Sequence, residues 1–478
     1  MKNTSKELGN NNKDVFLEDS ESTHSTKTQL SFAFGYFVRS FLFTVFTERV
    51  FAFYENEIKL DPILILIAFV FYTIWNMFND PLIGYISDKP NRFWNRWGRR
   101  FPWIVAMGLP YCFLIILVFA PPNISASAQP WIIFTWLIFT ACLYDTMFSG
   151  WMTNYYALFP DKYRSEKDRR RIAGIGSPIG LIATALAILI PPIFIEYGDK
   201  ISYLYAMIIL SIISFIFFLV SLPGSREEES LITHAQEFRK QKEKQVSFFR
   251  ALSQAFKYKN FLAYLIAYLA FHSLITIALG SIPYIVPFIL GEEADKEIFL
   301  SAGLLIGQLI GVPIWFLFMK KNGNRKLFLY GLFGAVISLI PMIFMFEIIG
   351  MVICIILLGF ILSSIYLGNQ LVFSDCIDEI VITSEKREEG VFLGIRTFIV
   401  RLSIIVQAVT FALTSVFTGF DPDLGTSNTD FALLGLRIQY AVIPLFIMLV
   451  GGICFWKLYD LTPEKVRKNK SKLNELGL

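Results

Sequence analysis

The sequence predicts an all-α membrane protein with about twelve transmembrane helices, and three observations support that fold class. Over half of the 478 residues are hydrophobic (55%), only 17% are charged, and 48 are Phe. A soluble domain of this size cannot cover so much apolar surface. Apolar runs of about 20 residues, the length that spans a bilayer, recur along the chain, and loops containing Lys and Arg separate them.

Twelve such runs divide the chain into two groups of six. The first six begin near residues 31, 62, 102, 131, 172 and 201, and the second six near residues 260, 299, 326, 351, 391 and 431. We therefore expect an N-terminal half at residues 30–222 and a C-terminal half at residues 260–458. Residues 223–259 between them are rich in Lys and Glu and are expected to be a cytoplasmic central loop, either a solvated linker or an amphipathic helix on the membrane surface.

Polar tails are expected at both ends of the chain. Residues 1–29 lack the apolar core of a cleavable signal and are interpreted as a mobile cytoplasmic tail, with a second cytoplasmic tail at residues 459–478. Basic clusters at residues 89–100, 162–171 and 320–326 all fall on the side of the N-terminus. Because positively charged loops stay in the cytoplasm, we expect a multi-pass protein of the cell membrane with both termini inside. A net charge of only +4 does not indicate nucleic-acid binding.

The two halves resemble each other in the same orientation. The tripeptide Ser-Glu-Lys occurs at residues 165–167, after the fourth predicted helix, and at residues 384–386, after the tenth. Asp80 precedes a Pro in the second helix, whereas Val312 precedes the matching Pro in the eighth. Two six-helix halves repeated in parallel around a central loop are the pattern of the major facilitator fold. One chain is sufficient for this fold, so we expect a monomer whose ion chemistry lies in the N-terminal half.

Asp80 is the central candidate residue. A carboxylate inside a membrane segment is costly and indicates an ion or substrate path. Asn76, four residues earlier, lies on the same helix face, and Asn79 is adjacent. The carboxylate and the two amide oxygens would supply hard ligands for a Na+ ion at Asp80, whereas H+ requires only the carboxylate. Both ions remain open and no other cofactor is expected; the alternative is that Asp80 only pairs with the basic loop.

Three further charged residues lie deep in predicted helices. Asp145 is near the middle of the fourth helix, and Arg39 and Arg401 lie near the midplane in the first and eleventh, judged from the rise per residue. Such side chains must face the interior and find partners, so we expect pairs of these arginines with Asp80 or Asp145. A pair that breaks and re-forms would couple ion to substrate. Alternatively, an arginine binds an acidic substrate through its forked donors, or the pairs are static.

Two aromatic and two acidic residues are further candidates. Trp75 and Tyr366 are candidates for stacking on sugar rings in the cavity, although with 16% aromatic residues either can simply be packed. Asp375 and Asp378 fall at the cytoplasmic end of the tenth helix, beside other charged residues. They form either a gating cluster of salt bridges or a solvated helix end.

One adjacent pair of opposite charge, Glu48 and Arg49, falls near the outer end of the first predicted helix. Long charged side chains at this depth extend to the interface while their stems stay in the apolar layer. We therefore expect both side chains at the membrane surface.

Two stretches around the second helix resemble a known family. Residues 75–84 (WNMFNDPLIG) and 97–103 (WGRRFPW) look like the second-helix signature of the glycoside–pentoside–hexuronide:cation symporters, the family of the melibiose carrier. Residues 159–170 (FPDKYRSEKDRR) and 375–378 (DCID) resemble further landmarks in the right order. The resemblance covers most of the chain. It implies cation-coupled alternating access, with the cation site on helices two and four.

The resemblance also assigns the cation site residue by residue. The family's second-helix aspartate before Pro falls on Asp80, the asparagine before it on Asn79, and the hydroxyl of helix four on Ser149. The family's other aspartate falls on Asn76. This departure leaves one carboxylate in the motif, which favours H+ over Na+.

The cavity positions differ more from the family. The helix-eleven lysine falls on Arg401 and the helix-ten aromatic residue on Tyr366. The sugar-binding aspartates of the melibiose carrier are replaced by Ser40 and Met152, so a galactoside is not supported. Arg39 falls on a basic position, and the extra arginines favour an acidic sugar or another anionic solute.

The sequence thus predicts a secondary active transporter that carries a sugar, glycoside or uronide together with H+ or Na+. The alternative is a carrier of the same fold for a lysolipid or another anionic amphiphile. In either case the expected partners are a small-molecule solute and membrane lipid. An enzyme is not indicated, because the sequence contains no metal cluster, nucleophile elbow or phosphate loop.

Overall fold

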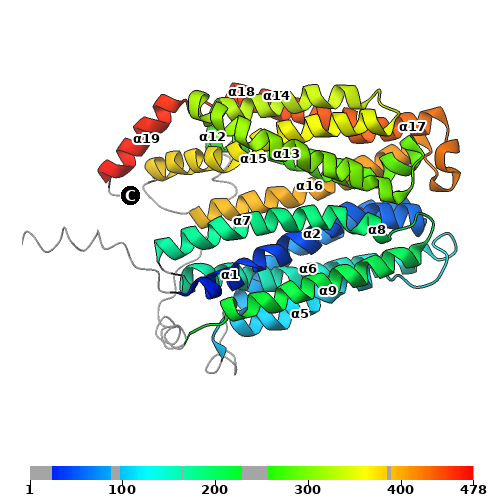
Figure 1. The fold of residues 1–478 in the computed structure, drawn as a ribbon, viewed down its shortest axis with the longest axis horizontal. Helices are drawn as coiled ribbons and strands as arrows, with labels where there is room; N and C mark the ends of the chain where they lie inside the picture. Colours follow the sequence, from blue (N-terminus) through cyan, green and yellow to red (C-terminus); the bar gives the residue numbers. More distant parts are fainter. Residues whose placement is uncertain (1–23, 88–96, 164, 229–256, 385–388, 477–478) are drawn as a thin grey trace, which may run out of the picture.

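The protein folds into a bundle of long helices that run roughly parallel to one another (Figure 1). The computed structural model describes residues 24–87, 97–163, 165–228, 257–384 and 389–476. Within these ranges, twelve helices are long and apolar enough to cross a membrane, and no β-strand occurs. These observations confirm the predicted all-α membrane fold.

The N-terminal half supplies the first six membrane-spanning helices. Its elements are α1 (Thr26–Ala33), α2 (Gly35–Ala52), the π-helical η1 (Phe53–Glu57), α3 (Pro62–Ser87), α5 (Phe101–Val118), α6 (Pro130–Lys162), α7 (Glu166–Leu189), α8 (Pro191–Phe194) and α9 (Lys200–Ser225). The helices α1, α2 and η1 together form the first span, and α7 with α8 forms the fifth. Because α1 begins at Thr26, the last residues of the segment expected as an N-terminal tail are helical.

The C-terminal half supplies the other six spans. Its elements are α12 (Lys259–Tyr284), η3 (Ile285–Leu290), η4 (Ala294–Lys296), α13 (Glu297–Asn322), α14 (Asn324–Met342), α15 (Ile348–Ser384), α16 (Glu389–Thr418), η5 (Pro422–Ser427), α17 (Asp430–Arg437), η6 (Ile438–Val442), α18 (Ile443–Leu458) and α19 (Pro463–Leu476). The helix α19 lies in the segment expected as a C-terminal tail. Most of the expected central loop lies outside the described residues.

Local sequence signals explain where several helices begin and end. The hydroxyl of Ser25, just before α1, accepts a hydrogen bond from the Thr28 amide at 3.2 Å. The Asp199 carboxylate does the same for the Ile201 amide at the start of α9, at 2.9 Å. Such caps satisfy amides that lack a partner within the helix. Gly323 ends α13 with φ of +82°, a conformation that favours glycine, and α14 begins at the next residue.

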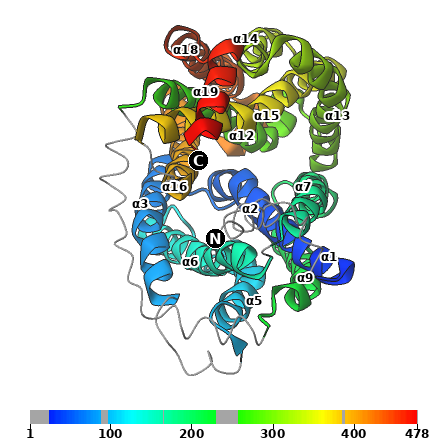
Figure 2. The ribbon, with the colours of Figure 1, turned by 90° about the vertical axis from the view of Figure 1, so that its left-hand side faces the viewer.

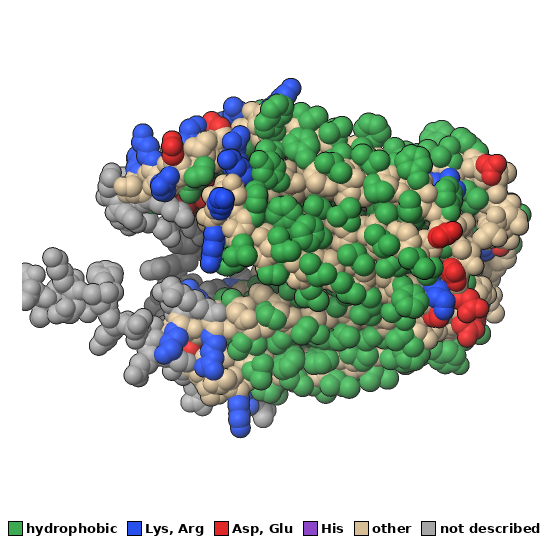
Figure 3. Space-filling model, turned by 45° about the horizontal axis from the view of Figure 1, so that its top comes forward, with side chains coloured by type: hydrophobic (Ala, Val, Ile, Leu, Met, Phe, Trp, Pro, Cys, Tyr) green, Lys and Arg blue, Asp and Glu red, His purple; other side chains and the backbone are tan. Residues whose placement is uncertain are grey.

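The two halves are separate at one end of the bundle and packed together at the other. The N-terminal half lies below the C-terminal half in Figure 1, with both described chain ends at the left. Figure 3 shows a hollow between the halves at that end, which we call the terminal end. At the opposite, distal end, the apolar core of the N-terminal half continues into the other half through Tyr284, Phe288, Phe411 and Phe420. The central space is therefore open at the terminal end and closed at the distal end.

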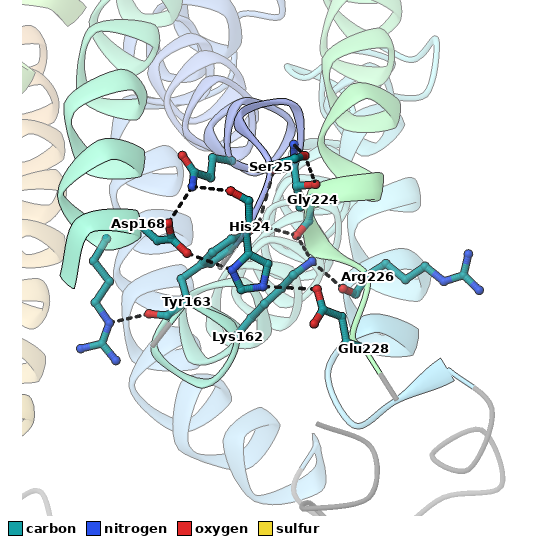
Figure 4. A network of polar contacts seen from close by, with 11 residues as sticks. His24, Ser25, Lys162, Tyr163, Asp168, Gly224, Arg226 and Glu228 are labelled. Atoms are coloured by element: carbon teal, nitrogen blue, oxygen red, sulfur yellow. Dashed lines mark hydrogen bonds and ion pairs between the residues drawn. The ribbon is translucent and has the colours of Figure 1, made fainter. Parts of the chain in front are cut away.

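A polar network at the terminal end ties α1 to α7 and to the chain leaving α9 (Figure 4). The ring of His24 lies with Nδ1 3.0 Å from Asp168 Oδ2 and Nε2 3.2 Å from Glu228 Oε1. The side-chain amide of Gln29 donates to Asp168 Oδ1 at 2.8 Å. These contacts join the segment before α2 and the chain after α9 to α7 of the N-terminal half.

Lys162, at the end of α6, completes this network. Its Nζ donates to the backbone carbonyls of Gly224 and Arg226 at 2.8 and 2.7 Å. Burial lowers the pKa of Lys162 to about 8, against the opposing effect of the Glu228 and Glu227 carboxylates. The two carbonyls satisfy donors that burial removes from water.

Candidate functional site

Three charged side chains join the two halves inside the bundle. Arg401 of α16 places Nη2 3.0 Å from Asp80 Oδ2 and Nη1 3.3 Å from Asp145 Oδ1. Asp80 lies on α3 and Asp145 on α6, so one guanidinium of the C-terminal half bridges two helices of the N-terminal half. Asp145 and Arg401 are buried, whereas the Asp80 side chain is 35% exposed. The structure thus brings together three residues that the sequence predicted as partners.

Two asparagines hold the buried carboxylate. Asn76 and Asn79 of α3 donate through Nδ2 to Asp145, to Oδ1 at 2.5 Å and to Oδ2 at 3.2 Å. Both asparagines are buried, and their spacing of three places them on one helix face. The sequence-based expectation set their amide oxygens beside Asp80. The structure instead turns their NH2 groups toward Asp145, because α6 packs against that face of α3.

Asp80 keeps one oxygen for a further ligand. In the described part of the chain, Asp80 Oδ1 is buried without a hydrogen-bond partner, and the same is true of the Ser149 hydroxyl oxygen on α6. When both aspartates are ionised, Asp80 and Asp145 place two carboxylates against the single guanidinium of Arg401. A net negative charge in this setting is unfavourable. One additional monovalent cation would neutralise the cluster.

Arg39 is exposed and has no carboxylate partner among the described residues. Tyr36 and Ser40, on the same side of α2, are partly exposed. The helix α2 lies at the centre of the bundle (Figure 2). The Arg39 guanidinium lies 5.6 Å from the centroid of the Tyr156 ring. Arg401 takes both carboxylates for which Arg39 was a predicted partner, and no ion pair to Arg39 occurs among the described residues.

A polar surface of the C-terminal half comes from α12, α15 and α16. Arg396 donates through Nη1 to Gln370 Oε1 at 2.8 Å. Its guanidinium lies 4.9 Å from the ring centroids of both Tyr268 and Phe373. Tyr366 is exposed and lies one helical turn before Gln370, on the same face of α15. The predicted cavity residue Tyr366 therefore shares a surface with an arginine that sequence reasoning did not single out for the cavity.

Trp75 lies on a different surface. The exposed side chains of Phe71, Trp75, Phe78 and Leu82 follow one another at helical spacing along α3, which lies at the outer edge of the bundle (Figure 2). Such an apolar stripe is typical of a face toward lipid. The Trp75 indole donates to the Thr146 hydroxyl at 3.0 Å. The structure thus places Trp75 on the lipid-facing side of α3, in contact with the residue that follows Asp145 on α6.

Asp375 and Asp378, the predicted gating residues, both lie near the terminal end of α15. Asp375 is buried and accepts a hydrogen bond from Asn324 Nδ2 at 3.2 Å. This contact joins α15 to α14 within the C-terminal half. It does not link the two halves.

Charged contacts between described residues link the halves at the distal end. Arg49 of α2 forms an ion pair with Glu297 of α13, and the Tyr197 hydroxyl donates to the same carboxylate. Glu48 lies 3.3 Å from the Arg49 guanidinium. The prediction that Glu48 and Arg49 lie at the membrane surface is wrong, because both are only 1% exposed. Their partner Glu297 begins a helix of the other half, a proximity that no local pattern in the sequence indicates.

A model of the MFS/sugar transport protein family matches residues 29–463. The chain belongs to this family. It is an integral, multi-pass transporter of the major facilitator superfamily (MFS), and the match confirms both the predicted fold and the resemblance to symporters of that superfamily.

Similar proteins include carriers of two different solutes. Sodium-dependent lysophosphatidylcholine symporter 1 of Gallus gallus is 23% identical over 460 residues, which cover 87% of this chain and 83% of that protein. A lactose permease of Lactobacillus delbrueckii is 22% identical over 404 residues, covering 81% of this chain and 62% of the permease. Among solved structures, an inward-facing bacterial homologue of the human lysosomal transporter Spinster superposes with a TM-score of 0.62 at 14% identity, covering 93% and 97% of the two chains. These relatives are transporters, in agreement with the sequence-based expectation.

Proposed function

We propose that this MFS protein is a cation-coupled symporter that moves an acidic sugar, such as a uronide, or a related glycoside by alternating access. The observation that carries the proposal is the bridge from Arg401 of one half to Asp80 and Asp145 of the other. A charged contact between the halves is sensitive to any ion that binds one of its members. Cation binding at Asp80 can therefore change how strongly the halves are held together.

In this mechanism a cation, H+ or Na+, competes with Arg401 for Asp80. The free Asp80 Oδ1 and the Ser149 hydroxyl oxygen are the acceptors available to it. Asn76 and Asn79 hold Asp145 in place, so Arg401 keeps one carboxylate partner while Asp80 is neutralised. The cation thus weakens one of two contacts between the halves and favours their rearrangement.

We propose that the protein resides in the cell membrane and that its terminal end faces the cytoplasm. Lys and Arg are concentrated at this end in Figure 3, whereas acidic side chains gather at the distal end, and basic segments stay in the cytoplasm. Both termini would then be cytoplasmic, and the structure would correspond to an inward-open state. Both halves belong to one chain, so we propose that it acts as a monomer.

An acidic solute is proposed because Arg39, on the central helix α2, is exposed and has no acid partner in the part of the chain that the structure describes. A guanidinium binds a carboxylate or phosphate with two parallel hydrogen bonds, and the exposed Tyr366 offers a ring for stacking. The second candidate solute is a lysophospholipid, favoured by the similarity to lysophosphatidylcholine symporters over 87% of the chain. Its phosphate would bind Arg39 in the same way.

Uptake into proteoliposomes tests this proposal and separates the two solutes. The panel contains neutral sugars, uronides and lysophosphatidylcholine, each measured with an imposed Na+ or H+ gradient. We expect gradient-driven uptake of a uronide, and uptake of only the lysophospholipid would select the second candidate. Failure of either gradient to increase uptake of any member would contradict the proposed symport.

Arg39→Gln is expected to raise the KM for the acidic solute by at least about tenfold. The lost charge-assisted hydrogen bonds are worth about 1.5–3 kcal/mol. Arg39→Lys is the matched control, because it keeps the charge and loses only the forked geometry, so its KM should lie between those of the wild type and Arg39→Gln. An equal loss for neutral and acidic solutes would show that Arg39 does not bind the acidic group.

A further inference from the structure

More acidic than basic side chains are buried in the described part of the distal end. Glu48 is 1% exposed, Glu55 3% and Glu297 0%, and all three lie where the halves meet. Arg49, 1% exposed, lies beside Glu48 and Glu297. Among the described residues, the basic side chain close to Glu55 is Lys59, which is 38% exposed and pairs with Asp423 at 2.7 Å. The described part of this end thus buries three carboxylates with one guanidinium, which contacts two of them.

The two carboxylates beside Arg49 differ in their contacts. Glu297 forms the ion pair with Arg49 and also accepts a hydrogen bond from the Tyr197 hydroxyl. Glu48 lies beside the same guanidinium, but neither of its oxygens has a hydrogen-bond partner in the described part of the chain. An ionised carboxylate that is buried without hydrogen bonds is strongly disfavoured, so such a group takes up a proton instead. Glu297 is therefore the carboxylate that Arg49 and Tyr197 hold together, and Glu48 is the one left to bind a proton.

Glu55 is in a similar position about two turns further along the same span. The Tyr284 hydroxyl of α12 donates to its Oε2, and Ser415 of α16 also contacts the carboxyl group. Its Oε1 has no hydrogen-bond partner among the described residues. The charged groups nearest to it, Lys59 and Asp61, follow it in the chain and have opposite signs. Neutral hydroxyls from the other half thus surround a second buried carboxyl group.

We propose that Glu48 and Glu55 form a proton-binding site that closes the distal end of the transporter. When the halves part at this end, water reaches both carboxylates and they ionise. When the halves close, each is buried against the other half and binds a proton. Acid therefore favours the closed distal end, and base favours its opening. The site is separate from Asp80 and rests on the alternating access of the proposed function.

The opening of the distal end can be measured directly by pulsed electron spin resonance. Spin labels are placed by Ala128→Cys and Glu347→Cys, two exposed positions in distal loops of the two halves, with the five native cysteines replaced by serine. The protein is held in lipid nanodiscs in Na+-free buffer between pH 5 and pH 8. The readout is the ratio of the short-distance (closed) to the long-distance (open) population. It needs no solute and no transport, so failure of the symport proposal is recognised separately by the uptake assay.

We expect the closed population to rise as the pH falls, with a slope of up to tenfold per pH unit for each linked proton. The glutamine of Glu48→Gln stays neutral, so this variant should have a larger closed population than the wild type at pH 8. Its slope with pH should be smaller by the contribution of one linked proton. The exposed Glu293 lies at the same end, and Glu293→Gln should retain the wild-type response. The response of the distal site should remain in Asp80→Asn, a variant that removes any pH dependence added by a proton at Asp80 through its contact with Arg401.

Two outcomes would overturn the proposal. One is a wild-type distance distribution that does not change with pH while Arg49→Gln, which breaks the ion pair, does open the distal end. This result would leave alternating access intact and remove the proton site. The other is a Glu48→Gln variant with the full wild-type slope.

Discussion

The Arg401→Gln variant is expected to lose accumulation of solute against its gradient. Removing the guanidinium leaves Asp145 buried with neutral partners, which are the amides of Asn76 and Asn79 and the Tyr72 hydroxyl. Breaking a buried ion pair from one side costs about 3–5 kcal/mol, which corresponds to a population shift of more than ~100-fold. The cation that enters to neutralise the two aspartates would then have no competitor and would stay bound. Coupling would be lost even if the solute still binds.

The measurement is the ratio of internal to external solute at steady state under an imposed cation gradient. Arg401→Lys is the matched control, because it keeps the charge but cannot contact two carboxylates with a planar fork, and we expect partial accumulation. The double variant Arg401→Gln with Asp145→Asn should regain folding stability but not accumulation. Wild-type accumulation by Arg401→Gln would remove Arg401 from the coupling mechanism.

The second large effect is expected at the distal end. Arg49→Gln removes the guanidinium from the buried Glu297 and leaves the Tyr197 hydroxyl as its donor among the described residues. The cost is again about 3–5 kcal/mol, and parting of the halves relieves it because water then reaches the carboxylate. We therefore expect the distal end to open at neutral pH, as measured by the distance between spin labels in the loops of the two halves.

A double variant separates this effect from general misfolding. Adding Glu297→Gln to Arg49→Gln removes both charges, so the distal end should close again. Glu57, which is partly exposed and accepts a hydrogen bond from the Gly198 amide of its own half at 3.1 Å, provides a neighbouring control. Glu57→Gln should leave the distance unchanged. A closed distal end in Arg49→Gln would mean that the apolar contacts alone hold the halves together.

Sequence reasoning predicts the fold and part of the site for a common physical reason. A bilayer imposes a length on every spanning helix, so the apolar runs alone place the twelve spans. It also makes an unpaired charge costly, so Arg401 was expected to pair with Asp80 or Asp145, as it does. Arg39 lies at a similar depth but has no such partner. Depth follows from position along a helix, whereas the choice between two arginines depends on helix rotation and packing, which local spacing does not determine.

The buried charges at the distal end show a second limit of prediction from sequence. Glu48 and Arg49 lie near the end of the first apolar run, where the interface is the usual place for charges. In the structure the helix continues through η1 to Glu57, and α13 of the other half covers it with Glu297. A buried partner 248 positions away in the chain cannot be found from the pattern around Arg49. The unusual density of acidic residues between Glu48 and Glu57 was the available signal.

Asp80→Asn tests the proposed coupling most directly, because asparagine is a neutral replacement that needs no cation. The measurement compares gradient-driven accumulation with exchange of labelled for unlabelled solute at equal concentrations, in the same proteoliposomes. We expect Asp80→Asn to retain exchange, since the solute site and the rearrangement of the halves remain, and to lose accumulation under either a Na+ or an H+ gradient. Accumulation equal to that of the wild type would contradict the claim that a cation at Asp80 drives transport.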